Sequence, residues 1–445
     1  MDSSTETPVE IAVGLSQVAT LIAEDWERVE MIMPGDLEVM ARTTKALVRR
    51  RGIRRAVDLL RIILAYSVCD WSLRLVGAWC VLAGIADISD VAILNRLRGS
   101  TTWLGCLIIK LLQRRRVHVR QQVGVRLRLA DATTVSHPGS QGTDWRIHLG
   151  LDLEAMCLTG IEVTDARGGE SLARFPGRPG EIWVGDRGYA YVRSLAPHLA
   201  AGDGLIVRIA WQNMPLEDEL GQRWDLIGWL RQISAAPSPG PQEVVVWLTT
   251  PYGRYPLRLM ASPLPQEAAD RARQRAHQAA KKKGRQPDAR TLLAAGFVLL
   301  LTNLPLAEWP APRIVEVYRV RWQIELLIKR LKSLLNLDGL RAQDPRLAQA
   351  YLLGKLLAAL LLDELTQVTA ALVPDWFTSL ERPPSPWRLT ACLYDQLRSL
   401  VRGPISLTQV IEKLPRLQRF LCDSPRKRRQ QLAVARSWFT NLSVC

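Results

Sequence analysis

The sequence predicts a mixed α/β protein whose core sheet, interrupted by a β-rich insertion, lies between helical N- and C-terminal regions. Helical apolar spacing fills roughly the first hundred residues, strand-like alternation begins near residue 123, and helical spacing returns after residue 340. The chain has 445 residues, 48% of them hydrophobic and 23% charged. Such a chain is long enough for about two to four domains with a substantial core.

Charge and cysteine usage narrow the class of protein. The 59 Lys and Arg residues against 43 Asp and Glu residues give a net charge of +16 at pH 7, which favours nucleic acid as partner. The seven cysteines are scattered singly without a Cys-x-x-Cys pair, which favours a reducing compartment over a zinc site. Apolar runs are too short to cross a bilayer, and no Gly-Lys-Ser phosphate loop occurs. Neither a membrane nor a nucleotide cofactor is therefore expected.

The N-terminal region, residues 1–118, is expected to be helical. Gly84 separates two apolar-periodic segments, and Ser89 and Asp90 are possible caps for a helix over residues 91–97. This pattern is typical of a helix-turn-helix or of a compact helical bundle, and the sequence leaves both interpretations open.

Two carboxylates follow predicted strands in the next region, residues 119–210. Alternation over residues 123–129 predicts a strand that delivers Asp131 at its end, and a short apolar strand at 182–184 is followed by Asp186 and a helical segment. Two further strands, at 145–153 and 156–163, would complete three adjacent antiparallel strands, and the last core strand is expected at 204–210. This arrangement is typical of a ribonuclease H-like core, although an Asp after a strand is commonly only a turn residue or a helix cap.

The insertion is expected to span residues 211–303. It contains a probable strand pattern only in the sense of alternation: a β-pair at 243–250 and 255–262, an exposed basic helix at 265–285 and a buried strand at 296–303.

The stretch 314–335 is expected to form one helix, because it is helix-favouring and contains neither Gly nor Pro. Its apolar residues share one broad face, and a narrow polar stripe beside that face holds four residues, Tyr318, Arg321, Glu325 and Lys332. An ordinary amphipathic surface helix with an Arg321–Glu325 ion pair would show the same stripe.

The spacing of these four residues resembles the YREK signature of the transposases of the insertion-sequence-four family. Asp186, Gly188 and Tyr191 are similarly spaced to the second motif of that family, and Asp131 lies where its first aspartate is expected. The resemblance covers roughly residues 123–340. It implies an Asp-Asp-Glu triad of Asp131, Asp186 and Glu325, which would be both catalytic and metal-binding.

The resemblance also implies an activity and its partners. The protein would be a DDE transposase that binds the ends of an insertion sequence and performs metal-dependent strand cleavage and strand transfer in the bacterial cytoplasm, at the nucleoid. Tyr318, Arg321 and Lys332 would contact double-stranded DNA, at transposon ends and target, within a homodimer. The cofactor would be two ions of Mg²⁺ or Mn²⁺, because hard cations prefer carboxylate oxygens and a metal pair can stabilise both the attacking and the leaving oxygen.

Other expectations follow from the same resemblance. The N-terminal region would bind DNA, residues 304–345 would carry the glutamate helix of the core, and the helical residues 346–445 would serve assembly. In relatives a Trp of the insertion stacks on a flipped base, for which three residues are candidates: Trp211, Trp224 and Trp247. Two alternatives remain open, namely a ribonuclease H-like nuclease without strand transfer and a non-catalytic DNA-binding relative.

Overall fold

The described residues form two compact units. The computed structural model describes residues 26–48, 52–119, 126–235, 240–372, 386–421 and 433–438. Unit 1 takes its described residues from Met1–Leu107 and Gln343–Cys445, and unit 2 takes them from Ile108–Ala342. Helix α7 (Thr101–Val119) runs from the first unit into the second.

The described part of unit 1 is helical, as the sequence predicts for both ends of the chain. Its helices are α2 (Glu27–Ile32), α3 (Leu37–Thr43), α4 (Ala56–Val68), α5 (Leu73–Leu82), α6 (Asp90–Gly99), α14 (Pro345–Leu372), α16 (Pro386–Arg402) and α17 (Leu407–Leu421). The expected cap is confirmed, since Ser89 Oγ accepts a 3.1 Å hydrogen bond from Ala92 N at the start of α6. Helix α14 packs against α4, α6 and α16, so the N- and C-terminal helices share one packed unit.

One helix among the described residues is long and apolar enough to cross a membrane by length and composition. It covers Pro345–Thr369, and most of it is buried inside the protein. A core helix of a soluble protein passes the same test, and this stretch contains the fully buried Lys355.

Unit 2 is built on one nine-stranded sheet. Its strands are β1 (Arg126–Val135), β2 (Trp145–Asp152), β3 (Cys157–Asp165), β4 (Glu181–Gly185), β5 (Gly204–Arg208), β6 (Leu216–Glu217), β7 (Gln242–Thr250), β8 (Gly253–Pro263) and β9 (Phe297–Thr302), in the order β3-β2-β1-β4-β5-β9-β8-β7-β6. Strands β1, β2 and β3 are antiparallel neighbours, whereas β1, β4 and β5 run parallel. The mixed sheet with helices confirms the expected fold class.

The first strand differs from the prediction in its extent. Asp131 lies inside β1, paired with Leu149 of β2, and not at the end of the strand as the sequence suggested. The polar residues after Leu129 looked like the end of a strand, but antiparallel pairing with β2 continues to Val135. Residues 123–125 of the predicted strand lie outside the described residues.

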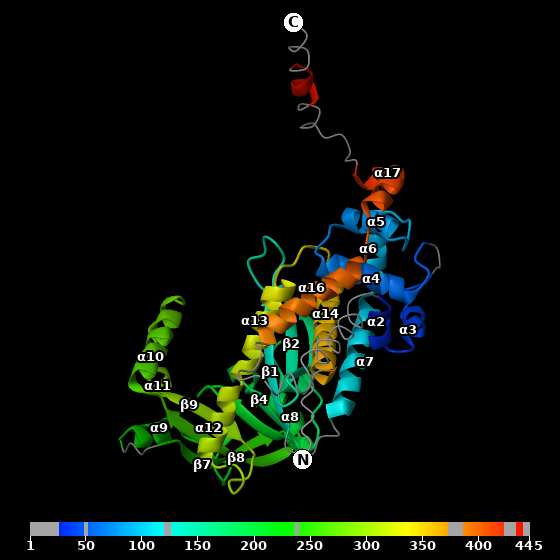
Figure 1. The fold of residues 1–445 in the computed structure, drawn as a ribbon. Coiled ribbons are helices and arrows are strands. Elements are labelled where there is room, and N and C mark those ends of the chain that lie inside the picture. Colours follow the sequence, from blue (N-terminus) through cyan, green and yellow to red (C-terminus); the bar gives the residue numbers. More distant parts are fainter. Residues whose placement is uncertain are drawn as a thin grey trace, which may run out of the picture. The chain divides into compact units, whose positions relative to one another are not determined.

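The strands of the expected insertion extend the core sheet. The predicted β-pair is confirmed as β7 and β8, and the predicted buried strand as β9, which pairs with β5 on one side and β8 on the other. Helices α9 (Leu226–Ala235), α10 (Gln266–Lys281) and α11 (Ala289–Ala294) connect these strands. Figure 1 shows α10, the expected basic helix, projecting away from the sheet.

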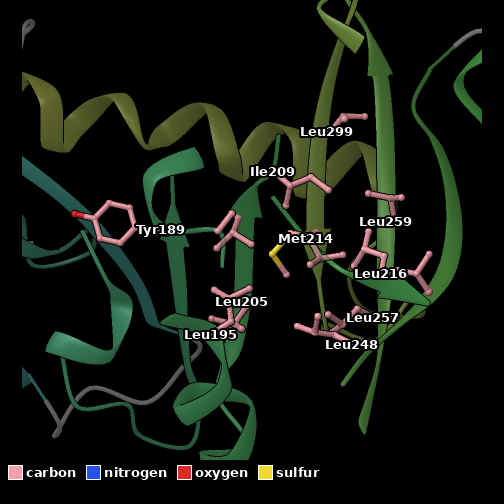
Figure 2. Packing of buried hydrophobic residues seen from close by; sticks show 14 of the residues in the cluster. Tyr189, Leu195, Leu205, Ile209, Met214, Leu216, Leu248, Leu257, Leu259 and Leu299 are labelled. Carbon is pink, nitrogen blue, oxygen red and sulfur yellow. The ribbon is translucent and has the colours of Figure 1, made fainter. Parts of the chain in front are cut away.

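A continuous apolar cluster joins the two halves of the sheet. It reaches from Trp183 of β4 and Leu205 of β5 to Leu299 of β9 and Leu259 of β8. Figure 2 shows part of this packing, with Tyr189 at its border. The core and the insertion therefore share apolar packing as well as backbone hydrogen bonds, and this holds the strand ends that carry the site.

Candidate active site

The parallel pairing of β1 with β4 brings two aspartates to the same edge of the sheet. Leu129 pairs with Val184 in the last registered pair. Asp131 and Asp186 each follow two residues later, so the register carries both past the carboxyl end of the pairing. A 3₁₀ turn, η2 (Arg187–Tyr189), begins directly after Asp186.

Helix α12 (Ala311–Val320) supplies the partner of Asp186. The Tyr318 hydroxyl donates a 3.1 Å hydrogen bond to Asp186 Oδ1. Burial and the negative charge of Asp186 raise the pKa of Tyr318 to about 12, so the phenol stays protonated and donating at neutral pH.

Arg321 joins the other two acidic residues. Its Nη2 donates a 2.5 Å hydrogen bond to Glu325 Oε1, and its Nη1 lies 3.8 Å from Asp131 Oδ2. Burial acts to lower the pKa of Arg321, but Tyr318, Glu325 and Asp186 outweigh that effect and raise it. The guanidinium is 13% exposed, so it remains charged as the counter-ion of both carboxylates.

The expected single helix over residues 314–335 is wrong in one respect. The structure has two helices, α12 and α13 (Trp322–Leu335), separated at Arg321. Backbone hydrogen bonds there span three residues, from Arg321 N to Tyr318 O and from Ile324 N to Arg321 O. The tightening has no Gly or Pro to signal it, and the side-chain contacts of Tyr318 and Arg321 favour it.

Lys332 lies apart from this group of contacts. Its closest acidic partner is Asp338, at 3.9 Å, and both side chains are partly exposed. Lys332 follows Glu325 by seven residues, about 10 Å along the helix axis. The structure thus links Asp131, Asp186, Tyr318, Arg321 and Glu325 through printed contacts and leaves Lys332 accessible on the same helix as Glu325.

Asp131 is a strained carboxylate electrostatically. Burial raises its pKa to about 6, although the Ala132 amide, which donates to Oδ1 at 2.8 Å, and Arg321 both act to lower it. The negative charges of Glu325 and Glu170 add to the rise. A desolvated carboxylate among others of like charge favours a cation as a neighbour.

The sequence-based argument missed three charged residues near this edge. Arg187 directly follows Asp186, and burial together with the positive charge of Arg208 lowers the pKa of Arg187. Both arginines line a cavity of about 480 Å³. The position of Arg187 beside Asp186 could have indicated it, but no spacing pointed to Arg208 or to Glu170.

Two of the three candidate tryptophans border cavities. Trp211 lines the 480 Å³ cavity and donates a 3.3 Å hydrogen bond to Thr291 Oγ1, while Arg290 lies 4.9 Å from its ring centre. Trp224 lines a neighbouring cavity of about 380 Å³. Trp247 is covered by Arg254, 4.6 Å from its ring centre. Their role in base stacking stays a prediction.

The donor chemistry fits a hard divalent cation. The site offers carboxylate oxygens, and its buried His148 has a pKa lowered to about 4 by burial and by Arg174 and Arg146, so that imidazole is neutral. Among the described residues, no three His, Cys, Asp or Glu side chains already stand close enough to share one ion. Asp131, Asp186 and Glu325 are the residues that would hold it.

Comparison with known proteins gives consistent results. A family model described as "Transposase DDE domain" matches residues 124–361. The chain is 42% identical over 340 residues to the putative transposase InsL for insertion sequence element IS186A of Escherichia coli (strain K12), covering 75% of this chain and 91% of the relative. It is 41% identical over 341 residues to the transposase for insertion sequence element IS421 of Escherichia coli, with the same two coverages of 75% and 91%.

A solved structure is also similar. It is the cryo-EM structure of the piggyBac transposase synaptic complex with hairpin DNA, with a TM-score of 0.43 and 10% sequence identity. The similarity covers 89% of this chain and 83% of that one.

Proposed function

Because the chain belongs to the DDE transposases of the insertion-sequence-four family, we propose that it binds the ends of an insertion sequence and catalyses metal-dependent strand cleavage and strand transfer. It is a DNA-cleaving and DNA-transferring enzyme. Asp131, Asp186 and Glu325 are the proposed catalytic, metal-binding triad.

One observation carries the assignment of these residues. Tyr318 and Arg321, from the α12–α13 segment, contact Asp186, Asp131 and Glu325, which come from three separate parts of the chain. A surface helix with an isolated ion pair would not need the second and third of these contacts. The convergence therefore supports an active site over an ordinary amphipathic helix.

Divalent cations, Mg²⁺ or Mn²⁺ and two in number by our proposal, would stabilise the charge that develops on the attacking and leaving oxygens of a phosphodiester. The protein's own groups would prepare that step. Tyr318 holds the orientation of Asp186, and Arg321 neutralises Asp131 and Glu325 until a cation replaces it.

The same basic residues would contact DNA. When Arg321 leaves Glu325, its planar fork can bind a phosphate in a bidentate manner, and the accessible Lys332 can bind another as a point charge. Tyr318 would contact the backbone beside them. Arg187 and Arg208 offer further positive charge at the edge that carries Asp186.

We extend the proposal to the assembly and to its place of action. Two copies of the chain would hold paired double-stranded ends and the target DNA, with the helices of residues 1–118 contributing DNA contacts and those of residues 346–445 contributing to assembly. A protein that acts on bacterial chromosomal DNA in this way would work in the cytoplasm.

Asp131→Asn and Glu325→Gln test the proposal in one assay. Each variant should lose cleavage and strand transfer of duplex DNA carrying the element's ends, with Mg²⁺ or Mn²⁺ present, and should still bind those ends in a mobility-shift assay. Glu154→Gln, an exposed carboxylate in the β2–β3 turn, is the matched control and should remain active. Full cleavage by either triad variant would refute the triad, and cleavage without strand transfer by the unmodified protein would favour a nuclease.

A further inference from the structure

Two residues of the second motif, Gly188 and Tyr191, have no part in the contacts described so far. The structure gives them a common neighbour, Glu170. A Cβ atom at residue 188 would lie 1.7 Å from Glu170 Oε2, so the carboxylate occupies the space that glycine leaves free. The Tyr191 hydroxyl donates a 2.8 Å hydrogen bond to the backbone oxygen of Glu170. Both motif residues therefore position one acidic side chain.

The loop before Glu170 is held in place by side chains of the core. Arg146 Nη1 donates to Gly168 O, and Arg174 Nε donates to Gly169 O, each at 2.9 Å. With Tyr191, three consecutive backbone oxygens are therefore fixed by side-chain donors. This is a preorganised carboxylate and not the tip of a free loop.

Glu170 faces Asp131. Its negative charge contributes to the raised pKa of Asp131, after burial and together with Glu325. Within the ranges that the structure describes, no Lys or Arg forms an ion pair with the Glu170 carboxylate, and no hydrogen bond to it is formed. A half-buried carboxylate beside another one is unfavourable unless a cation joins them.

A fully buried hydroxyl points to the same place. Tyr189 is 0% exposed, and its Oη has no hydrogen-bond partner in the described part of the chain. Burial raises the pKa of Tyr189, and the charges of Asp131 and Glu170 add to the rise, so these carboxylates are its acidic neighbours. In Figure 2 the hydroxyl points away from the labelled leucines Leu195 and Leu205. A buried donor without an acceptor indicates a missing polar group, such as a repositioned carboxylate or a cation's water.

We propose that Glu170 is a fourth carboxylate of the active site, which binds a divalent cation together with Asp131, and that Gly188 and Tyr191 are its positioning residues. The inference rests on the proposed function, because it concerns the same cation site. Oxygen ligands that already lie beside Asp131 are what a hard cation selects. Tyr189 would then donate its hydrogen bond to one of the two cation-bound carboxylates.

Calorimetric titration of Mn²⁺ into the full-length protein without DNA tests this, since it reads cation binding and not activity. Glu170→Gln keeps the size of the side chain and the backbone oxygen that Tyr191 binds, and it should weaken Mn²⁺ binding at least about tenfold. Glu154→Gln removes the same charge from an exposed turn and should leave the affinity unchanged. Unchanged Mn²⁺ affinity in Glu170→Gln, with an unchanged melting temperature, would overturn the inference.

Asp131→Asn separates this result from the proposed function. Loss of Mn²⁺ binding in Asp131→Asn but not in Glu170→Gln removes only the fourth carboxylate. Unchanged binding in both variants contradicts the proposed triad as well.

A double-mutant cycle tests the positioning role of Gly188. Gly188→Ala should weaken Mn²⁺ binding by displacing the Glu170 carboxylate, whereas the same change added to Glu170→Gln should weaken it no further. Tyr191→Phe should produce a smaller loss of the same kind. Additive losses from Gly188→Ala and Glu170→Gln would show that residue 188 acts on the site independently and would overturn the positioning role.

Discussion

At the scale of single residues, Asp131 makes the stability of the metal-free protein depend on pH. Its pKa is raised by burial from 3.8 to about 6, so between these values the folded protein binds more protons than the unfolded chain. Stability should therefore fall as pH rises through this window and level off above it.

Asp131→Asn removes this effect. The variant should match the unmodified protein below pH 4 and exceed its free energy of unfolding above pH 6, by at most on the order of 2–3 kcal/mol. Denaturant titrations at pH 4 and pH 8 with a chelator present check this. A variant that is less stable at pH 8 would show that Asp131 is stabilised as a carboxylate in the folded state.

Lys332 makes a second prediction at this scale. Its pair with Asp338 is long and partly exposed, so Lys332→Ala should change the free energy of unfolding by less than about 1 kcal/mol. Loss of a charge-assisted phosphate contact should nevertheless weaken binding to the element's ends by about 1.5–3 kcal/mol. Asp338→Asn is the control, because it removes the partner and leaves the lysine. Wild-type affinity of Lys332→Ala at two salt concentrations would leave Lys332 as a solvated surface residue.

At the scale of elements, a buried ion cluster fixes the three strands around Asp131. Arg128 of β1 donates to Asp152 of β2 at 2.6 Å and to Glu181 of β4 at 2.7 Å, and the arginine side chain is 3% exposed. The cluster lies three residues before Asp131, so it also holds the register that brings Asp131 beside Asp186.

Arg128→Met should destabilise the protein by about 3–5 kcal/mol, because it leaves two buried carboxylates without a counter-ion. Chemical denaturation measures the loss. The control, Arg271→Leu, removes an exposed i,i+4 pair with Glu267 on α10 and should cost less than about 1 kcal/mol. Equal effects of the two changes would mean that Asp152 and Glu181 are neutralised by other groups.

At the scale of the whole molecule, the net charge of +16 should appear in the salt dependence of DNA binding. The logarithm of the affinity should fall linearly with the logarithm of salt concentration, by about 0.9 per phosphate neutralised. Lys332→Ala should lower this slope by about one. Fluorescence anisotropy with a labelled duplex at several salt concentrations measures both slopes, and a flat response would point to a protein partner.

The local part of the fold was predictable from the sequence. Alternation and helical spacing predicted β2, β3, β4, β7, β8 and β9, and the spacing of Tyr318, Arg321 and Glu325 placed all three along one edge. These features depend on residues a few positions apart, whose periodicity is written directly in the chain. The assignment of Asp131, Asp186 and Glu325 to one site remains a proposal that the contacts of Tyr318 and Arg321 support.

Only the tertiary structure decided the features that depend on distant residues. The helix breaks at Arg321 although no residue there disfavours helix, Asp131 lies inside β1 because β2 continues to pair, and β9 joins the insertion to the core sheet. Glu170 reaches Gly188 through contacts between loops, without any sequence spacing to indicate it. Local periodicity carries no information on such pairings, because their free energy comes from burial and hydrogen bonds between segments that the chain brings together only on folding.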